Sequence, residues 1–290
     1  AFIQTLALPH GFTFKAGRFY SGIGYINEQH AHVWDFVDAP LAQQAFLGGQ
    51  YADDGAQIRW LAPTDTYLEL GGEVGRGHNF PGSERNKNGI GGYSLFAHVG
   101  GDVGVSNSWL AGLSYLHDAP NGREFTDHGV TNAFTGTSHL WLGSFVWKWA
   151  PEGNPYYRNF KFQTEYYRNR ENGNLTYDLG GAGEQIAGYR AAQSGWYAQG
   201  VYQFLPRWRT GLRYDRLSYG SVDMGALAGS LPALSDHDPT RTSLMVDYNP
   251  SEFSRFRLQL ARDNSRKDAP DNQIMLQYIM SLGAHGAHQF

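Results

Sequence analysis

Residues 207–215 read Arg-Trp-Arg-Thr-Gly-Leu-Arg-Tyr-Asp, and two kinds of side chain alternate along them. One set of positions holds the charged side chains Arg207, Arg209, Arg213 and Asp215, and the other holds Trp208, Leu212 and Tyr214. Successive side chains of a β-strand point to opposite faces. The stretch therefore predicts a strand with one face in water and the other in an apolar phase. Residues 253–263 repeat the pattern, with Arg255 and Arg257 opposite Phe256 and Leu258.

Segments of this kind recur along the whole chain. We expect strands at 2–8, 12–18, 56–62, 66–76, 91–103, 107–117, 137–149, 159–171, 193–205, 207–219, 240–248, 253–264 and 273–284. Short Pro-, Gly- and Asn-containing links alternate with long ones at 19–55, 77–90, 118–136, 172–192, 220–239 and 265–272. Tight turns at one end and long loops at the other are typical of an outer-membrane barrel. The strands of a soluble β-sandwich or a soluble barrel also alternate. Their charged face would then point to bulk water, and the aromatic face would need a core much wider than a single soluble barrel encloses.

Composition supports this all-β, transmembrane, antiparallel up-and-down barrel and limits other functions. Mean hydropathy is −0.48, as expected when only alternate residues face lipid. No run approaches the roughly 18 apolar residues of a membrane helix. The 290 residues hold no Cys, which leaves no disulfide framework or thiolate site. A net charge of −4 makes a nucleic-acid partner unexpected. No signal peptide is visible at Ala1, so we expect a mature form or part of a longer polypeptide.

Three stretches carry a resemblance to a known group of proteins. They are Phe2-Ile-Gln-Thr-Leu-Ala-Leu-Pro with Lys15-Ala-Gly-Arg-Phe, residues 29–38 (Gln-His-Ala-His-Val-Trp-Asp-Phe-Val-Asp), and the closing residues 280–290, which end on Phe290. The chain resembles proteobacterial outer-membrane barrels related to the phosphate-selective porins, a group often labelled zinc-regulated or TonB-dependent receptors. The resemblance implies a bacterial outer-membrane location, lipid and lipopolysaccharide as surroundings, and Phe290 as the terminal aromatic signal read by the barrel assembly machinery.

The number of strands suggests that the barrel is larger than this chain. Thirteen is odd, whereas single-chain bacterial barrels have an even number. Members of the resembled group usually carry about three further N-terminal strands, which implies sixteen in the complete barrel. We expect residues 1–290 to form a single barrel domain, with 19–55 folded inward as a constriction loop that includes Tyr20, Glu28, Asp35 and Asp38. Trimers are usual among sixteen-stranded relatives, although no residue here requires a homotrimer.

Charged residues on the predicted water-facing side define a candidate pore lining. The basic members are Lys15, Arg59, Lys148, Lys161, Arg207, Arg209, Arg213, Arg241, Arg255 and Arg257. The acidic members are Glu69, Glu73, Asp102, Glu165, Asp215, Asp247 and Asp263. Fixed charge in a narrow pore selects ions by sign, so the basic excess predicts a weak anion preference. A lattice of salt bridges that only stabilises the interior is the alternative interpretation.

Histidines suggest two further kinds of site, a metal site and a catalytic site. His30 and His32, with Glu28 and Asp35 nearby, are competent ligands for a divalent metal, although an HxH pair in a loop more often hydrogen-bonds a barrel wall. His139 and Ser144 lack a supporting Asn or Asp, so we expect no enzyme and no cofactor.

The sequence thus predicts a porin-like channel for passive diffusion of small hydrophilic solutes or ions. The alternatives are an outer-membrane receptor that takes up a metal ion and a barrel scaffold for an envelope partner protein.

Overall fold

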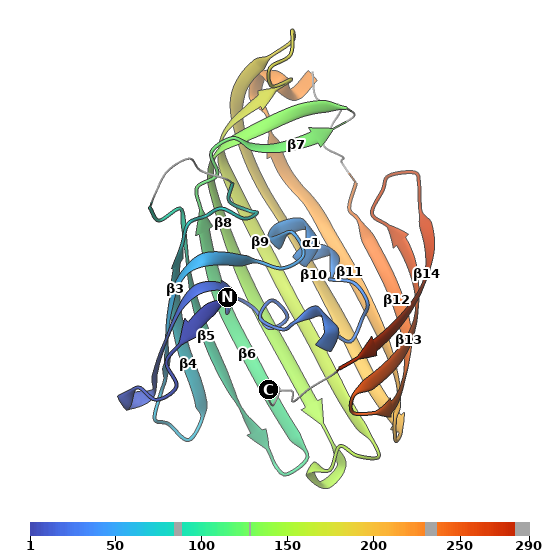
Figure 1. Cartoon of the computed structure of the whole chain (residues 1–290). Helices are drawn as coiled ribbons and strands as arrows, with labels where there is room; N and C mark the ends of the chain where they lie inside the picture. The colour runs from blue at the N-terminus through green and yellow to red at the C-terminus, as the bar shows by residue number, and fades with distance from the viewer. Residues whose placement is uncertain (84–88, 128, 230–236, 282–290) are drawn as a thin grey trace.

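The computed structural model describes residues 1–83, 89–127, 129–229 and 237–281, and their strands form one strongly curved antiparallel sheet (Figure 1). The strands are β1 (Phe2–Gln4), β2 (Phe12–Tyr20), β3 (Ala52–Leu61), β4 (Tyr67–Gly75), β5 (Gly92–Val103), β6 (Asn107–Asp118), β7 (Arg123–Asp127), β8 (Val130–Trp149), β9 (Asn159–Tyr177), β10 (Gln185–Leu205), β11 (Trp208–Asp223), β12 (Thr240–Ser251), β13 (Ser254–Asn264) and β14 (Asp271–Met280).

The sheet follows the chain without a crossover. Each strand pairs with its neighbours in sequence order, except that β7 pairs only with β8. Of the fourteen strands in the described residues, thirteen therefore lie along the main path, as the alternation predicted. The all-β, up-and-down antiparallel architecture is confirmed. Within the described residues β1 and β14 do not pair with each other, so the sheet is not closed.

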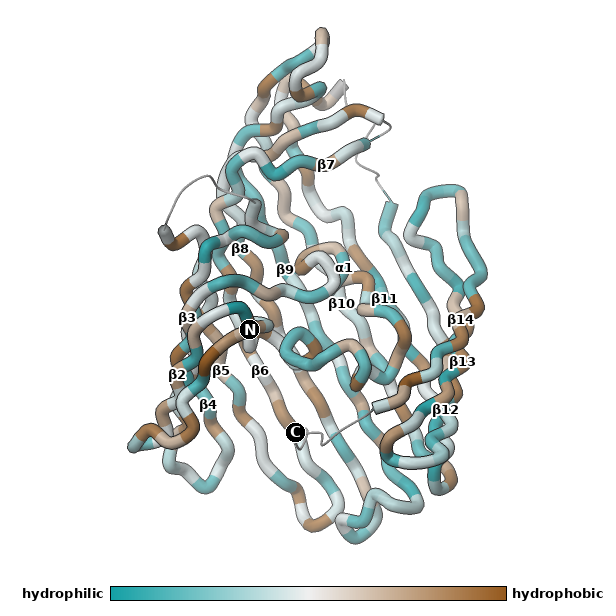
Figure 2. Tube along the Cα trace, in the orientation of Figure 1, coloured by the Kyte–Doolittle hydropathy of each residue, from teal (hydrophilic) through white to brown (hydrophobic). Residues whose placement is uncertain are grey.

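The convex face of the sheet is apolar and exposed. Trp208 and Phe256, on which the two-faced interpretation depends, are 40% and 50% exposed, and Leu276 is 83% exposed. Side chains buried in a packed interior would instead have indicated a soluble core. Hydrophilic and hydrophobic residues alternate along the strands in Figure 2. This is the pattern expected of strands with lipid on one side and a polar interior on the other.

Aromatic rings gather at both ends of this convex face. Near the short turns Trp208 packs on Tyr248 and Phe256 on Tyr278, each pair with ring centroids 4.7 Å apart. Towards the long-loop end Tyr115 packs on Trp141 at 4.8 Å, and Trp196 on Tyr214 at 5.6 Å. Two aromatic belts with aliphatic side chains between them are typical of the two interfaces of a bilayer.

The strand limits differ from the predicted ones mainly at the long-loop end. β8, β9 and β10 continue well beyond the predicted limits, so most of 172–192 is hairpin strand, and 118–136 contains β7 and the start of β8. There Asn172 and Asn174 are exposed on the outer face of β9, whereas Leu175 is buried on the inner face with Phe134 and Tyr189. The apolar side chains thus face inward, the reverse of the pattern from which the strands were predicted. β1 is shorter than predicted and covers only Phe2–Gln4.

Helical segments are few and short. They are α1 (Leu41–Leu47) and the 3-10 turns η1 (Pro9–Gly11), η2 (Ala31–Val33), η3 (Pro151–Gly153) and η4 (Gly225–Gly229). None of the helices in the described part of the chain has the length and apolar character needed to cross a membrane.

Candidate functional site

The connection between β2 and β3, residues 21–51, lies against the concave face of the sheet (Figure 1). Its helix α1 contacts β9, β10 and β11, far from the strands to which the segment is joined. We call residues 21–51 the inner segment. Asn27 ties its two ends together, because its side-chain amide donates to the carbonyls of Ser21 and Tyr51 and its Oδ1 accepts from the Tyr51 N–H at 2.7 Å.

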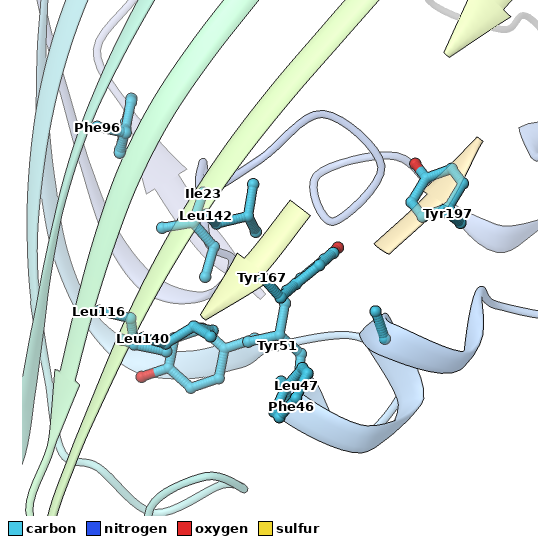
Figure 3. Close-up of a cluster of buried hydrophobic side chains, with 11 residues drawn as sticks. Ile23, Phe46, Leu47, Tyr51, Phe96, Leu116, Leu140, Leu142, Tyr167 and Tyr197 are labelled. Atoms are coloured by element: carbon cyan, nitrogen blue, oxygen red, sulfur yellow. The ribbon is translucent and has the colours of Figure 1, made fainter. Parts of the chain in front are cut away.

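An apolar cluster fixes the inner segment to the wall (Figure 3). The segment contributes Ile23, Ala42, Phe46, Leu47 and Tyr51, and the strands contribute Phe96, Leu116, Leu140, Leu142, Tyr167 and Tyr197. Phe46 stacks on Tyr167 with ring centroids 6.2 Å apart. The hydrophobic effect is not directional. Burial of these side chains therefore holds the inner segment against the wall, whereas the polar contacts determine its exact position there.

Wall carboxylates hold the backbone of the inner segment. Glu73 accepts from the Gly22 N–H at 2.8 Å and from the Ser21 hydroxyl. Glu165 accepts from the Tyr25 N–H at 2.5 Å and from the hydroxyls of Tyr167 and Tyr197, each at 2.9 Å. Asp215 accepts from the Leu41 N–H at 3.0 Å, at the start of α1. Loop backbone N–H groups that would lack partners in a buried position are thereby satisfied.

Carboxylates of the inner segment in turn bind wall cations. Asp35 pairs with Lys161 and with Arg209, the latter at 3.3 Å. Burial alone would raise the pKa of Asp35, but Lys161 and Arg209 outweigh it and hold the pKa well below the usual range. This carboxylate is therefore ionised at neutral pH.

Asp38 is the second such anchor. It lies 3.0 Å from Arg213 and also pairs with Arg241, and its Oδ1 accepts from Gln259 Nε2 at 2.7 Å. Burial opposes ionisation here too, and the two guanidinium groups together with Gln259 lower the pKa of Asp38. One carboxylate thus joins the inner segment to β11, β12 and β13.

Beside the inner segment is a cavity of about 1580 Å³. Its charged lining comprises seven basic residues, Lys15, Arg18, Arg59, Lys148, Lys161, Arg209 and Arg255, and three acidic residues, Glu28, Asp35 and Glu69. Seven minus three gives a net lining charge of +4 with histidines counted as neutral. Charged side chains of the inner segment and of the wall thus lie together around this cavity.

The predicted pore-lining residues divide into three groups. Six line the cavity: Lys15, Arg59, Lys148, Lys161, Arg209 and Arg255. Arg213, Arg241 and Arg257 lie on the same concave face but are buried in ion pairs with Asp215, Asp263 and Asp247. Arg207 lies instead in the turn between β10 and β11, exposed and with φ of 73°. The prediction that Arg207 lines the pore is wrong, because β11 begins only at Trp208. Arg207 has the same two-residue spacing from Arg209 as a strand residue would have, and so it could not be told apart in the sequence.

The predicted constriction residues also lie near the cavity or the wall. Tyr20 and Glu28 line the cavity together with Asp35, whereas Asp38 serves as an anchor. Glu28 pairs with Arg59 and lies 3.7 Å from Lys15. That Glu73, Glu165 and Asp215 bind the backbone of the inner segment could not be predicted, because every residue except proline has the same peptide N–H.

The structure brings His30 and His32 together, without a third ligand among the residues that it describes. Their rings stack with centroids 5.6 Å apart, and Tyr20 packs edge-on against His30 at 5.5 Å. Glu28 and Asp35, the carboxylates expected beside them, are paired with Arg59, Lys161 and Arg209. No group of three or more potential ligands occurs within the described ranges. Metal binding by the two histidines stays a prediction.

The structure separates His139 from Ser144, the pair considered for catalysis. His139 faces outward on β8, where its Nδ1 lies 2.7 Å from the Tyr115 hydroxyl, whereas Ser144 lines the interior cavity. The two side chains that invited a catalytic interpretation therefore point to opposite faces. Phe290 lies outside the described residues.

Comparison with known proteins supports the fold and leaves the family open. No protein-family model matches the chain. An uncharacterised protein of Aquifex aeolicus is 32% identical over 312 residues, and this chain spans 62% of its length. The membership predicted from the resemblance to phosphate-selective porins stays a prediction.

Solved structures of outer-membrane proteins resemble the chain at low identity. A loop L8 deletion mutant of OmpT, an outer membrane protein of Vibrio cholerae, is 14% identical with a TM-score of 0.55, over 92% of this chain and 75% of that one. The outer membrane channel DcaP of Acinetobacter baumannii is 14% identical with a TM-score of 0.52, over 93% and 71%. A trimer form of OmpT gives a TM-score of 0.53 at 13% identity, over 92% and 77%. The chain therefore has the fold of outer-membrane β-barrel proteins.

Proposed function

We propose that this chain forms most of an outer-membrane channel through which small hydrophilic solutes or ions diffuse passively, with a weak preference for anions. The observation that carries the proposal is the cavity of about 1580 Å³ beside the inner segment, with its net lining charge of +4. A pore that narrows at such a place sieves by size, and its fixed charge biases which ions enter. That DcaP, an outer membrane channel, has a similar fold supports the proposal.

The location in the membrane follows from the outer surface. The exposed apolar band between two aromatic belts matches a bilayer core and its interfaces. Insertion would use the barrel assembly machinery, with lipid and lipopolysaccharide as surroundings. A homotrimer is compatible with the trimer form of OmpT.

Closure of the barrel belongs to the same proposal. The edges β1 and β14 leave backbone groups unpaired, and an unpaired edge in lipid costs several kcal/mol for each group, by rough estimate. We infer that about three further strands pair with these edges in the complete barrel, which would give the sixteen expected from parity.

Conductance across a planar bilayer tests the channel. The complete protein should give stable ohmic steps, and asymmetric KCl should give a reversal potential of the sign produced by anion preference. Silence after verified insertion would favour a receptor or scaffold for an envelope partner. Zn²⁺ calorimetry on the wild type and on His30→Ala/His32→Ala tests the metal-receptor alternative, which predicts heat that the double variant loses.

A further inference from the structure

A strip of basic and imidazole side chains lies on the outward face, above the aromatic belt of the long-loop end. Along the sheet it comprises His117 on β6, His139 on β8, Arg168 and Arg170 on β9, and Arg190 on β10. His139 is the register partner of both His117 and Arg170, and Arg190 is the partner of Asn172. The five side chains therefore form a continuous band across four strands, which we call the outer basic strip.

The strip lies above the aromatic belt near the short turns, which includes Trp109, Trp147, Phe160 and Trp208. His117, His139 and Arg168 lie eight positions above Trp109, Trp147 and Phe160 on their respective strands, as Arg216 does above Trp208. Arg170 lies ten positions above Phe160, and Arg190 lies twelve above Tyr202, the register partner of Phe160. At ~3.4 Å per residue and a tilt of ~40°, eight positions rise ~21 Å along the membrane normal. This is close to the ~25 Å height of a barrel's apolar band. His117, His139 and Arg168 therefore lie where the hydrocarbon ends, and Arg170 and Arg190 lie further out, at the level of the lipid headgroups.

Arg168 and Arg170 have no carboxylate beside them on the outward face. The outward positions of β6, β8, β9 and β10 hold no Asp or Glu, whereas Arg190 lies opposite Asp223 of β11. Arg168, Arg170 and Arg190 form no salt bridge with any residue that the structure describes. By contrast, Arg216 at the same height pairs with Asp238 at 3.1 Å, and Arg262 donates to Asn272 at 2.9 Å.

We propose that the outer basic strip binds phosphate groups of lipid headgroups in the outer leaflet. Guanidinium groups match phosphate oxygens through two parallel hydrogen bonds. The aromatic belt beneath, with Trp141 and Trp196 exposed, would hold the same lipid at the level of its upper acyl chains. A free anion would form only the guanidinium contacts, whereas a lipid would also contact the aromatic belt. The strip therefore favours a lipid over a free anion. This inference rests on the proposed function as an outer-membrane channel, because the long loops of such barrels lie on the extracellular side and hence at the outer leaflet.

Native mass spectrometry of the full chain folded in detergent tests the proposal with two probes, phosphorylated lipid A and the same lipid after enzymatic dephosphorylation. We expect the phosphorylated lipid to be retained at least about tenfold better. The triple variant Arg168→Gln/Arg170→Gln/Arg190→Gln should lose this preference. The matched control, Arg216→Gln/Arg262→Gln, removes two guanidinium groups from the same outward face and should keep it.

A triple Arg→Lys variant at the same three positions separates a loss of lipid binding from a loss of folding. It keeps the positive charge but cannot form the two parallel hydrogen bonds of a guanidinium group. Its preference should lie between those of the wild type and the Gln variant. Equal retention of the two lipids by the wild type would overturn the proposal. So would an equal loss in the control, or complete displacement of lipid by excess inorganic phosphate.

Conductance of the triple Gln variant separates this proposal from the channel. Its substitutions lie on the outward face, so its conductance should equal that of the wild type. A wild type without conductance that still prefers the phosphorylated lipid would refute the channel and leave the lipid site standing.

Discussion

Asp38 connects three wall strands to the inner segment through a single carboxylate. Replacing it with Asn leaves Arg213 and Arg241 without one of their anionic partners, in a position where Arg213 is 1% exposed. Removing one member of a buried ion pair typically costs about 3 kcal/mol or more. We therefore expect backbone hydrogen exchange in residues 21–51 to accelerate by about 100-fold in Asp38→Asn, measured by mass spectrometry.

The matched control is Asp238→Asn, which breaks the exposed pair with Arg216. Such surface pairs contribute ~0–1 kcal/mol, so exchange in the inner segment should stay unchanged. Equal acceleration in both variants would mean that Asp38 does not anchor the segment.

The same carboxylates predict how the docking of the inner segment depends on pH. The pKa values of Asp35 and Asp38 are lower when the segment is docked than their ordinary value of 3.8. A lowered pKa stabilises the docked form fully above the ordinary value, and this stabilisation declines as pH falls through the docked value. Single-channel conductance should thus stay constant from pH 7 to about 5 and become noisy only below about 4. Onset of noise at about pH 6 would implicate other groups.

At the scale of a strand, the outward face should tolerate charge only near its ends. Leu212 on β11 is 55% exposed at mid-strand, and Thr242 lies on the same face of β12, beside Tyr214 of the upper belt. Arg at the bilayer midplane costs about 2–4 kcal/mol, and near an interface about 0–1 kcal/mol. Leu212→Arg should therefore lower the free energy of unfolding in lipid vesicles by about 3 kcal/mol, and Thr242→Arg by less than about 1 kcal/mol. Similar losses in both would argue against a lipid-facing surface.

The strands were predictable where their two faces meet different solvents. Trp208 and Leu212 alternate with Arg209 and Arg213, so both the period and the orientation of β11 could be derived from sequence. The upper ends of β9 and β10 could not, because polar side chains such as Asn172 and Asn174 face water there on the outside as well. At that level the apolar side chains, such as Leu175 and Tyr189, are buried on the inner face, so the alternation is the reverse of that in a lipid-facing strand.

At the scale of the molecule, the position of the inner segment was predictable only in outline. Its length and its aromatic residues suggested an inward fold, and alternation placed Lys161, Arg209 and Arg213 on the facing wall. Which acid meets which base was not accessible, because the Asp35 and Asp38 contacts join residues more than a hundred positions apart. Such pairs depend on the curvature of the whole sheet.

The ion selectivity of the channel should follow the net charge of the residues that line the cavity. Lys148→Glu/Arg255→Glu changes seven basic and three acidic lining residues to five of each, so the net lining charge falls from +4 to 0. Because a pore selects by fixed charge, the reversal potential in asymmetric KCl should move to near that of an unselective pore. Arg216→Glu, outside the cavity, is the control and should leave it unchanged. If the double variant conducts with the wild-type reversal potential, the ions pass elsewhere and the cavity beside the inner segment is not their path.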